Sequence, residues 1–377
     1  MKNLLAKHYG LLNADISRLP LGAVNRNFLV HAEGQAYVLK QYATASYTPE
    51  HIAHTCDVQF QLREAGLPVP EILRNKAGEW ITPIEAELPV SQTMRNRAGE
   101  GNATGVEAVR SPSHETEGSP SAGTGFLVLS RFVSGEHQLR GSISEKAAYN
   151  SGVLLARLHE QMSAMPNAKP FAMKPLQDAL RDTESLLHRA EQVRRRSAVD
   201  ETACAVLRYK LQAMKQLEDL SAVSEKLPAQ WVHGDYHEVN LLFTPEQEVA
   251  AVFDFDNLRC MPRGLEFMRS LSLMFSSGPR GLEEGAYAFF EGYARYTNDL
   301  TEAELALYVP LRRYYALTRH WPIQQRYETP DLYDERWDKF ITPPSDWWEV
   351  HGKTVTERLL HIWARCQRKT LDGETSF

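Results

Sequence analysis

The pattern of apolar and polar residues is most distinctive near the middle of the chain, in residues 231–243 and 249–256. Each stretch contains a short apolar run with the β-branched or aromatic residues of a buried strand, and the first run leads into a polar loop. The pattern predicts a hairpin-like platform that presents polar side chains at one edge. These side chains are three carboxylates and one amide: Asp235, Asn240, Asp254 and Asp256.

The amino-terminal third has the alternation of a small antiparallel sheet. Residues 21–30 and 36–40 predict two strands, and the second strand ends in Lys40. Further short strands are expected at 72–73, 80–81 and 126–133. One amphipathic helix is expected from about residue 49 to residue 62, because Gly66 follows it and glycine commonly ends a helix.

The composition changes abruptly between residues 94 and 125. This segment is rich in Gly, Ser and Pro and contains few large apolar residues. It cannot bury enough surface to offset the entropy lost on ordering, so we expect a flexible insertion between two strands of the first lobe. A simple spacer and a regulatory lid are both compatible with this composition.

After residue 134 the apolar periodicity becomes helical, with apolar residues recurring every three or four positions. The predicted helices cover residues 144–162, 176–193, 201–223, 263–276, 281–296 and 301–325. The chain beyond residue 325 is aromatic and irregular, and acids alternate with its aromatic residues. Such a mixture binds a cationic, sugar-like or choline-like substrate through ion pairs and cation–π contacts. Equally, these aromatic side chains can pin helices together.

Length and composition predict an ordinary globular protein with two lobes. The chain has 377 residues, of which 43% are hydrophobic and 24% charged, and it is too long for one compact core. A formal net charge of −6 argues against nucleic acid as a partner and suits a cationic or neutral substrate better.

Four cysteines without Cys-x-x-Cys spacing disfavour zinc and a disulfide framework, which suggests reduced thiols. The sequence shows neither a signal peptide nor a run of the roughly 18 apolar residues that a membrane helix needs. We therefore expect a cytoplasmic protein that does not bind membranes. The sequence does not indicate its oligomeric state.

The polar residues of the central platform match the needs of phosphoryl transfer from ATP. This reaction needs an acid to orient the attacking hydroxyl and accept its proton, and oxygen ligands for the Mg²⁺ ion that bridges the phosphates. Asp235, Asn240 five positions later, and Asp254 followed by Phe255 occur in the order found in protein kinases. The ordered set is a much more specific signal than a single His-Gly-Asp triplet.

The motif His233-Gly234-Asp235, with Asn240 and then Asp254-Phe255-Asp256, resembles that of the aminoglycoside phosphotransferase and choline kinase-like family. The resemblance spans nearly the whole chain apart from the insertion. It implies an α+β, bilobal, protein kinase-like fold, in which a small lobe with an antiparallel sheet and a helix precedes a larger, mainly helical lobe. It further implies a nucleotide-binding lobe at 1–133, a catalytic and substrate-binding lobe at 134–377, and ATP and Mg²⁺ as cofactors.

The resemblance also assigns roles to individual residues. Asp235 becomes the catalytic base or hydroxyl-orienting acid. The expected metal ligands are Asn240, Asp254 and Asp256. The residues expected at the nucleotide are Lys40 at the phosphates, Gly22, Asn25 and Asn27 in a loop over them, and Leu129, Arg131 and Phe132 at the adenine. Lys40 could instead be a surface lysine, and the two asparagines could serve only to form turns.

Two positions depart from the family pattern. Relatives carry a glutamate on the first-lobe helix that holds the strand lysine, whereas Asp57 is the nearest candidate here. Relatives also carry an aspartate that starts a later helix and braces the catalytic loop, and Glu266 stands nearest that position. His233 is expected to brace the loop, and His159 to be a core histidine.

The predicted function is therefore an ATP-dependent phosphotransferase that moves the γ-phosphate to a hydroxyl of a small molecule, which is aminoglycoside-, choline- or homoserine-like. A protein serine/threonine kinase is one alternative. The departures at Asp57 and Glu266 leave a second, a nucleotide-binding pseudokinase without turnover. Retention of the three motif residues argues against the pseudokinase.

Overall fold

A computed structural model of the chain describes residues 1–19, 25–42, 47–85, 124–166, 170–193, 196–275, 282, 284–297, 299–330, 333–343 and 347–371. The described residues form two compact units. The first takes its residues from 1–85, 124–136 and 250–256, and the second from 137–249 and 257–371. The sequence division at residue 133 leaves 250–256 in the second lobe, whereas the structure places this segment in the first unit.

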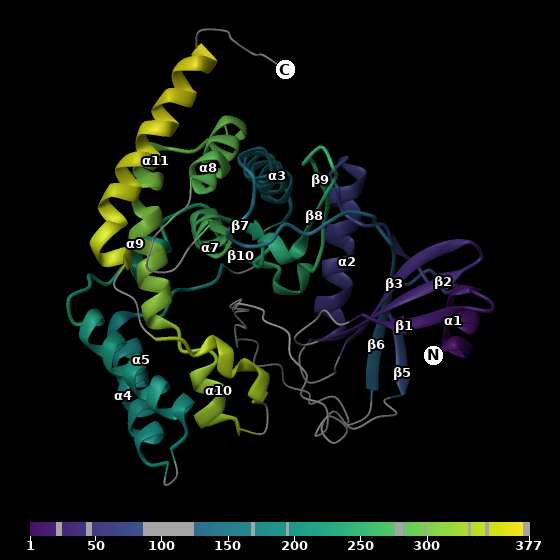
Figure 1. Cartoon of the computed structure of the whole chain (residues 1–377), viewed down its shortest axis with the longest axis horizontal. Helices are drawn as coiled ribbons and strands as arrows, with labels where there is room; N and C mark the ends of the chain where they lie inside the picture. Colours follow the sequence, from purple (N-terminus) through teal and green to yellow (C-terminus); the bar gives the residue numbers. More distant parts are fainter. Residues whose placement is uncertain are drawn as a thin grey trace. The chain divides into compact units, whose positions relative to one another are not determined.

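The first unit is built on an antiparallel sheet with the strand order β1-β2-β3-β6-β4, and β5 also pairs with β6 (Figure 1). Its elements are α1 (Lys2–Tyr9), β1 (Asp15–Arg18), β2 (Arg26–Ala32), β3 (Gln35–Tyr42), α2 (Pro49–Glu64), β4 (Ile72–Leu73), β5 (Thr82–Glu85) and β6 (Thr124–Arg131). The segment expected to be a flexible insertion lies outside the described residues, except for Thr124 and Gly125, which begin β6.

Alternation along β6 gives this sheet two buried faces. Leu127 and Leu129 pack in a cluster with Leu5 of α1, whereas Val128 packs with Ile52 and Cys56 of α2. Successive strand side chains point to opposite faces, so one strand contributes to both cores. Thr48, a residue type favoured at helix amino termini, caps α2: its side chain accepts a hydrogen bond from the His51 backbone N–H at 3.2 Å.

The second unit is mainly helical, as predicted. Its helices are α3 (Glu145–Ser163), α4 (Leu176–Glu191), α5 (Ala198–Met214), α6 (Ser221–Ser224), α7 (Arg263–Phe275), α8 (Gly285–Tyr296), α9 (Glu302–Thr318), α10 (Ile323–Glu328) and α11 (Trp347–Leu371). Helix α3 lies along α8, and α11 lies along α8 and α9 (Figure 1). Its antiparallel pair of strands is β7 (Ala229–Val232) and β10 (Arg259–Pro262).

The remaining elements are the strands β8 (Leu241–Phe243) and β9 (Val249–Val252) and the 3-10 helices η1 (Glu238–Asn240), η2 (Phe255–Asn257) and η5 (Glu335–Phe340). A turn closed by the Thr244 amide, which donates to the Glu248 carbonyl at 2.9 Å, joins β8 to β9. These short elements carry the motif residues and set the direction of their side chains.

Two predictions for the carboxy-terminal third were wrong. The helix expected at 301–325 ends at Thr318, and a new helix starts at Ile323, directly after Pro322, which has no N–H to donate within a helix. The stretch expected to be irregular contains α11, 25 residues long. Its buried stripe consists of Val355, Leu359, Ile362 and Cys366, which have helical spacing.

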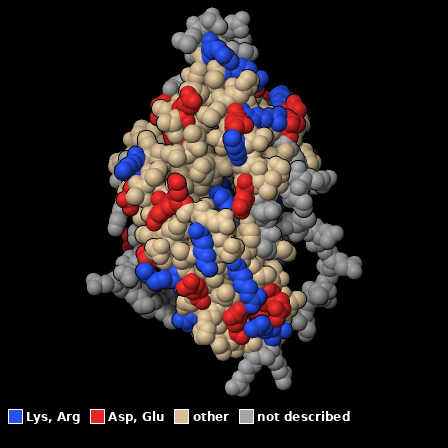
Figure 2. All heavy atoms as spheres, turned by 90° about the vertical axis from the view of Figure 1, so that its left-hand side faces the viewer, with Lys and Arg blue, Asp and Glu red and all other residues tan. Residues whose placement is uncertain are grey.

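On the face of the molecule in Figure 2, basic and acidic side chains are interspersed, without a broad patch of either sign. Ion pairs tie α11 to its neighbours, such as Arg365 to Glu291 at 2.9 Å and Arg313 to Glu349 at 2.8 Å. All four cysteines are buried and unbridged. Among the described residues, none of the helices combines the length and the apolar character needed to cross a membrane.

Candidate active site

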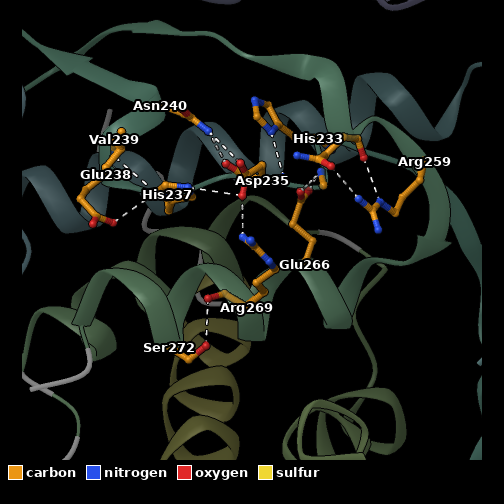
Figure 3. Close-up of polar contacts among 12 residues, drawn as sticks. His233, Asp235, His237, Glu238, Val239, Asn240, Arg259, Glu266, Arg269 and Ser272 are labelled. Atoms are coloured by element: carbon orange, nitrogen blue, oxygen red, sulfur yellow. Dashed lines mark hydrogen bonds and ion pairs between the residues drawn. The ribbon is translucent and has the colours of Figure 1, made fainter. Parts of the chain in front are cut away.

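The loop after β7 holds Asp235 as a buried carboxylate. Asp235 is 6% exposed, and Asn240 of η1 is 5% exposed. The Asn240 amide donates to the Asp235 carbonyl at 2.9 Å and approaches the carboxylate Oδ2 at 3.4 Å (Figure 3). Because the Asn240 nitrogen is turned toward Asp235, its Oδ1 atom is the one that can ligate a cation.

Glu266, in the first turn of α7, braces this loop from below. Its carboxylate accepts hydrogen bonds from the backbone N–H groups of His233, at 3.2 Å, and Gly234 (Figure 3). It also accepts one from His159 Nε2 at 2.8 Å. Burial alone would raise the pKa of Glu266, but His159, His233 and these hydrogen bonds lower it. The brace is therefore an ionised carboxylate with several donors, a strong arrangement for fixing a backbone.

The backbone conformation and close packing at position 234 require a glycine. Its φ of 81° lies in the left-handed region, and a Cβ atom there would lie 1.9 Å from the Asn257 carbonyl oxygen. A glycine before Asp235 therefore allows the loop to turn against the strand connection on which it packs.

Positive charge surrounds the Asp235 carboxylate. Arg269 Nη1 lies 2.8 Å and His237 Nε2 lies 3.3 Å from Asp235 Oδ1 (Figure 3). Burial would raise the pKa of Asp235, but the charges of Arg269 and His237 outweigh it and hold the pKa well below its usual range. Asp235 is consequently ionised at neutral pH. Glu238, paired with Arg140 at 3.0 Å, lies 3.5 Å from the other His237 ring nitrogen.

The first unit gathers a second charged group around Lys40. Lys40 Nζ lies 2.7 Å from Asp254 Oδ1 and 2.7 Å from Asp256 Oδ2. The Asp256 carboxylate also accepts hydrogen bonds from Asn25 at 2.6 Å and from the Tyr42 hydroxyl at 2.8 Å. Asp254 has a φ of 68°, and its side chain remains 39% exposed. This exposure leaves it able to bind a ligand.

Two carboxylates share a single ammonium group here, and the pKa values of Asp256 and Lys40 reflect it. Burial, together with the neighbouring charge of Asp254, raises the pKa of Asp256 to about 6, although Lys40 lowers it. Burial would lower the pKa of Lys40, but Asp254 and Asp256 raise it. The group carries more negative than positive charge when both acids are ionised, so an additional cation would be stabilised there.

Comparison with known proteins identifies the family. A model described as the phosphotransferase enzyme family matches residues 15–298. The chain belongs to the phosphotransferase enzyme family. It is accordingly a phosphotransferase, and the recognition made from the His-Gly-Asp motif is confirmed.

Solved structures with the same fold are distant in sequence. An amicoumacin kinase in complex with AMP-PNP and Ca²⁺ is 15% identical, with a TM-score of 0.53, over 95% of this chain and 88% of the other. A microcompartment-associated aminopropanol kinase is 17% identical, with a TM-score of 0.53, over 98% and 97%. An aminoglycoside phosphotransferase from Alicyclobacillus acidocaldarius is 15% identical, with a TM-score of 0.52, over 94% and 92%.

At these identities the likeness shows the fold alone, and it confirms the predicted kinase-like fold class. No curated protein matched the sequence.

The structure of this phosphotransferase corrects the choice of partner for Lys40. Asp57 lies on an exposed position of α2, where its carboxylate accepts a hydrogen bond from Trp80 Nε1 at 2.5 Å. Asp254 and Asp256 pair with Lys40 instead. The physical reason is orientation: Cys56, next to Asp57, faces the core, so Asp57 points to the surface.

Of the other residues expected at the nucleotide, the structure brings Asn25 to Asp256 and pairs Asn27 with Lys40 across β2 and β3. Gly22 lies outside the described residues. Leu129, Arg131 and Phe132 lie at the end of β6, where the Arg131 and Phe132 amides donate to the Glu71 and Ala36 carbonyls at 2.8 and 3.1 Å. Their role at the adenine stays a prediction.

The sequence analysis did not predict two hydrogen-bond partners of Asp256, namely Tyr42 and His51. His51 Nε2 lies 2.9 Å from the Asp256 carbonyl oxygen. Tyr42 was detectable, because it lies two residues after Lys40 and side chains two apart on a strand share one face. His51 was not, because its contact joins residues 205 positions apart.

The oxygen-bearing residues fit a magnesium–nucleotide complex better than a protein-only metal site. Among the described residues, no group of three or more His, Cys, Asp or Glu side chains could hold a metal ion. Mg²⁺ usually takes only one or two carboxylates and completes its shell with phosphates and water. Asp254 and Asp256, which already attract the Lys40 ammonium, supply suitable hard oxygen atoms.

Proposed function

We propose that this phosphotransferase uses ATP to phosphorylate a hydroxyl group of a small molecule. The observation that carries the proposal is Asp235, a buried carboxylate that Arg269 and His237 keep ionised, on a loop that Glu266 fixes. The structural neighbours, which include an aminopropanol kinase, an amicoumacin kinase and an aminoglycoside phosphotransferase, favour a small-molecule acceptor over a protein.

The low pKa of Asp235 limits the role that it can take. A carboxylate so readily ionised is a weak base, since efficient general bases have pKa values near the working pH. In a loose phosphoryl-transfer transition state, the hydroxyl proton need not leave before the new bond forms. We therefore assign Asp235 to orienting the hydroxyl oxygen toward the phosphorus and to accepting the proton late in the reaction.

The first unit contributes the phosphate-binding residues. Lys40 contacts the α- and β-phosphates, and Asn25 and Asn27 belong to the segment that covers them. Asp254 and Asp256 of this unit would hold Mg²⁺. Bound there, Mg²⁺ would neutralise the negative charge that develops on the phosphates during transfer.

An acceptor screen with two matched variants tests the proposal. ATP consumption is measured with Mg²⁺ over amino alcohols, sugars, hydroxy acids, aminoglycosides and generic protein substrates. We expect turnover with a small hydroxyl compound, and a loss of about 10²–10⁴ in kcat for Asp235→Asn, the range for removing a proton-transfer group. Asp182→Asn is the control, because Asp182 is an exposed aspartate of α4 that pairs with Lys174.

The outcomes separate the alternatives. Turnover that Asp235→Asn leaves intact would remove Asp235 from the reaction. Turnover with protein substrates alone would favour the protein kinase. Binding of ATP without consumption for any acceptor would favour the pseudokinase.

A further inference from the structure

Helix α2 contacts the charged group around Lys40 without using an acidic side chain. All of α2 is described, and its three acidic residues are exposed; they are Glu50, Asp57 and Glu64. Lys40 pairs with Asp254 and Asp256, which come from a distant part of the sequence. The glutamate that was expected to join this helix to the lysine therefore has no equivalent on α2.

His51, in the first turn of α2, reaches the same group by another contact. Its ring Nε2 atom lies 2.9 Å from the Asp256 carbonyl oxygen. Because a carbonyl oxygen can only accept a hydrogen bond, Nε2 carries the proton and His51 is the donor. The backbone of His51 is fixed in turn, since its N–H group donates to the Thr48 side chain that caps the helix. The start of α2 thus holds the main chain of Asp256.

The side chain of Asp256 is held as well, and aromatic rings join the two contacts. The Tyr42 hydroxyl donates to Asp256 Oδ1 at 2.8 Å. The Tyr47 ring stacks on the His51 ring with centres 5.6 Å apart, and it meets the Tyr42 ring edge to face at 5.8 Å. Such ring pairs have preferred geometries and fix one another. We call His51, Tyr47 and Tyr42 the aromatic bracket, because they hold Asp256 at both its carbonyl and its carboxylate.

Asp256 in turn fixes the position of Lys40. Its Oδ2 atom lies 2.7 Å from Lys40 Nζ and accepts a hydrogen bond from Asn25 at 2.6 Å. Lys40 Nζ also lies 5.1 Å from the centre of the Tyr42 ring, within the range of a cation–π contact. A lysine side chain has four flexible carbons, and ordering it costs entropy. These contacts select one arrangement of Lys40 before a ligand binds.

The backbone beside Asp256 needs support of this kind. Asp254 has a φ of 68°, in the left-handed region that is uncommon for residues other than glycine. A strained conformation persists only where surrounding contacts hold it. The hydrogen bond from His51 meets the main chain two residues further on. His51 therefore helps to hold both carboxylates against the Lys40 ammonium.

We propose that His51 is a positioning residue for nucleotide binding: α2 acts on Lys40 through His51 and Asp256, and Asp256 takes the part expected of a helix glutamate. This inference rests on the proposed function, in which Lys40 contacts the α- and β-phosphates. It assigns to His51 an effect on phosphate binding, although His51 itself touches neither Lys40 nor the phosphates. The effect depends on a single hydrogen bond, so the reach of one side chain can test it.

Two substitutions at position 51 differ only in that reach. Glutamine brings its amide nitrogen to about the place of His51 Nε2, whereas asparagine is one methylene shorter and falls short of the Asp256 carbonyl. Both remove the ring, so their comparison isolates the hydrogen bond. ATP with Mg²⁺, and adenosine, are titrated separately by calorimetry into the wild type, His51→Gln and His51→Asn. We expect His51→Asn to bind ATP about five- to tenfold more weakly than His51→Gln, the effect of one hydrogen bond, and the two to bind adenosine equally, because adenosine has no phosphates.

Three further variants place the effect. Glu50→Gln is the control, because Glu50 is exposed in the same turn of α2, and it should bind ATP like the wild type. Tyr42→Phe keeps His51 and removes the other contact of the aromatic bracket with Asp256, so it should weaken ATP binding by a similar factor. In a Lys40→Met background, His51→Gln and His51→Asn should bind ATP equally, because the effect passes through Lys40.

The results that would overturn the inference differ from those that would overturn the proposed function. Equal ATP affinities of His51→Gln and His51→Asn would overturn the inference alone. An equal loss of adenosine affinity would also overturn it, because it would indicate a general loosening of the first unit. A difference that persists in the Lys40→Met background would show that His51 acts by another route. Failure of the wild type to bind ATP would overturn the proposed function and, with it, this inference.

Discussion

Asp235 and Asp256 are both buried acids of the motif, yet their pKa values shift in opposite directions. Burial raises the pKa of each. Around Asp235 the positive charges of Arg269 and His237 outweigh burial. Around Asp256 a single Lys40 must serve Asp254 as well, and burial prevails. The balance of neighbouring charges therefore decides the sign of the pKa shift.

The largest expected effect comes from a substitution that distorts the backbone of the loop carrying Asp235. Gly234→Ala adds left-handed strain and a clash with Asn257, so we expect the free energy of unfolding to fall by about 2–5 kcal/mol and turnover to be lost. Gly66→Ala is the control, because its φ is 76° but nothing lies within 4 Å of the added Cβ. It should cost only about 1–2 kcal/mol in urea unfolding. Equal costs would contradict the close packing of the loop.

A smaller effect is expected when the Glu266 carboxylate, which holds the loop amides, loses its charge. Glu266→Gln weakens the hydrogen bonds to the loop amides and His159, which should cost about 2–3 kcal/mol of unfolding free energy. Because Asp235 then loses its fixed position, kcat should fall by more than tenfold while the KM for ATP changes little.

The control for this variant is Glu304→Gln, which weakens a buried ion pair with Arg263 outside the loop. It should lower stability to a similar extent and leave kcat close to that of the wild type. If both variants lower kcat equally, the effect of Glu266 is one of general stability.

In the first unit, Tyr42→Phe tests the environment of Asp256, because it removes a single hydrogen bond to the Asp256 carboxylate. We expect a cost of about 1–2 kcal/mol in unfolding free energy and a higher KM for ATP. Tyr37→Phe on the same strand is matched to it, since the Tyr37 hydroxyl accepts from Arg131 at 3.3 Å, away from the acids. An unchanged KM for ATP in Tyr42→Phe would argue against a nucleotide role for Asp256.

The smallest effect concerns pH. The folded pKa of Glu266 is lowered, so its stabilising contribution is fully present above the unfolded pKa of about 4.3 and is lost as pH falls toward the folded pKa. The difference in unfolding free energy between wild type and Glu266→Gln should therefore be constant from pH 7 to about 5.5 and shrink below about 4.3. Urea unfolding across this range measures it. If this difference in unfolding free energy grew on acidification, it would contradict a lowered pKa of Glu266 in the folded protein.

Local patterns in the sequence were enough to find the fold class and the motif. The alternation before Lys40 predicted strand β3, and the spacing of Asp235 and Asn240 predicted a catalytic loop. Helix α11 was not predicted, although its buried residues have helical spacing. In that case the signal was present in the sequence.

Contacts between distant segments could not be predicted in the same way. Arg269 of α7 and Asp235 of the loop after β7 belong to different segments and pair only after folding. Likewise, Asp256 reaches Asn25 across 231 positions. The position of Glu266 was noticed as a departure from the family, but its action on the loop depends on packing that no local pattern contains.

The route of the chain through residues 250–256 has a consequence for dissecting the protein into fragments. A fragment cut after residue 136 would contain Lys40, Asn25 and Tyr42 but would lack the carboxylates that bind them. Complementation by a synthetic peptide spanning 250–256 should then restore order around Lys40, visible as slower proteolysis of that fragment. A substitution or an inserted tag near residue 253 would accordingly disturb a unit whose other described residues all precede residue 137.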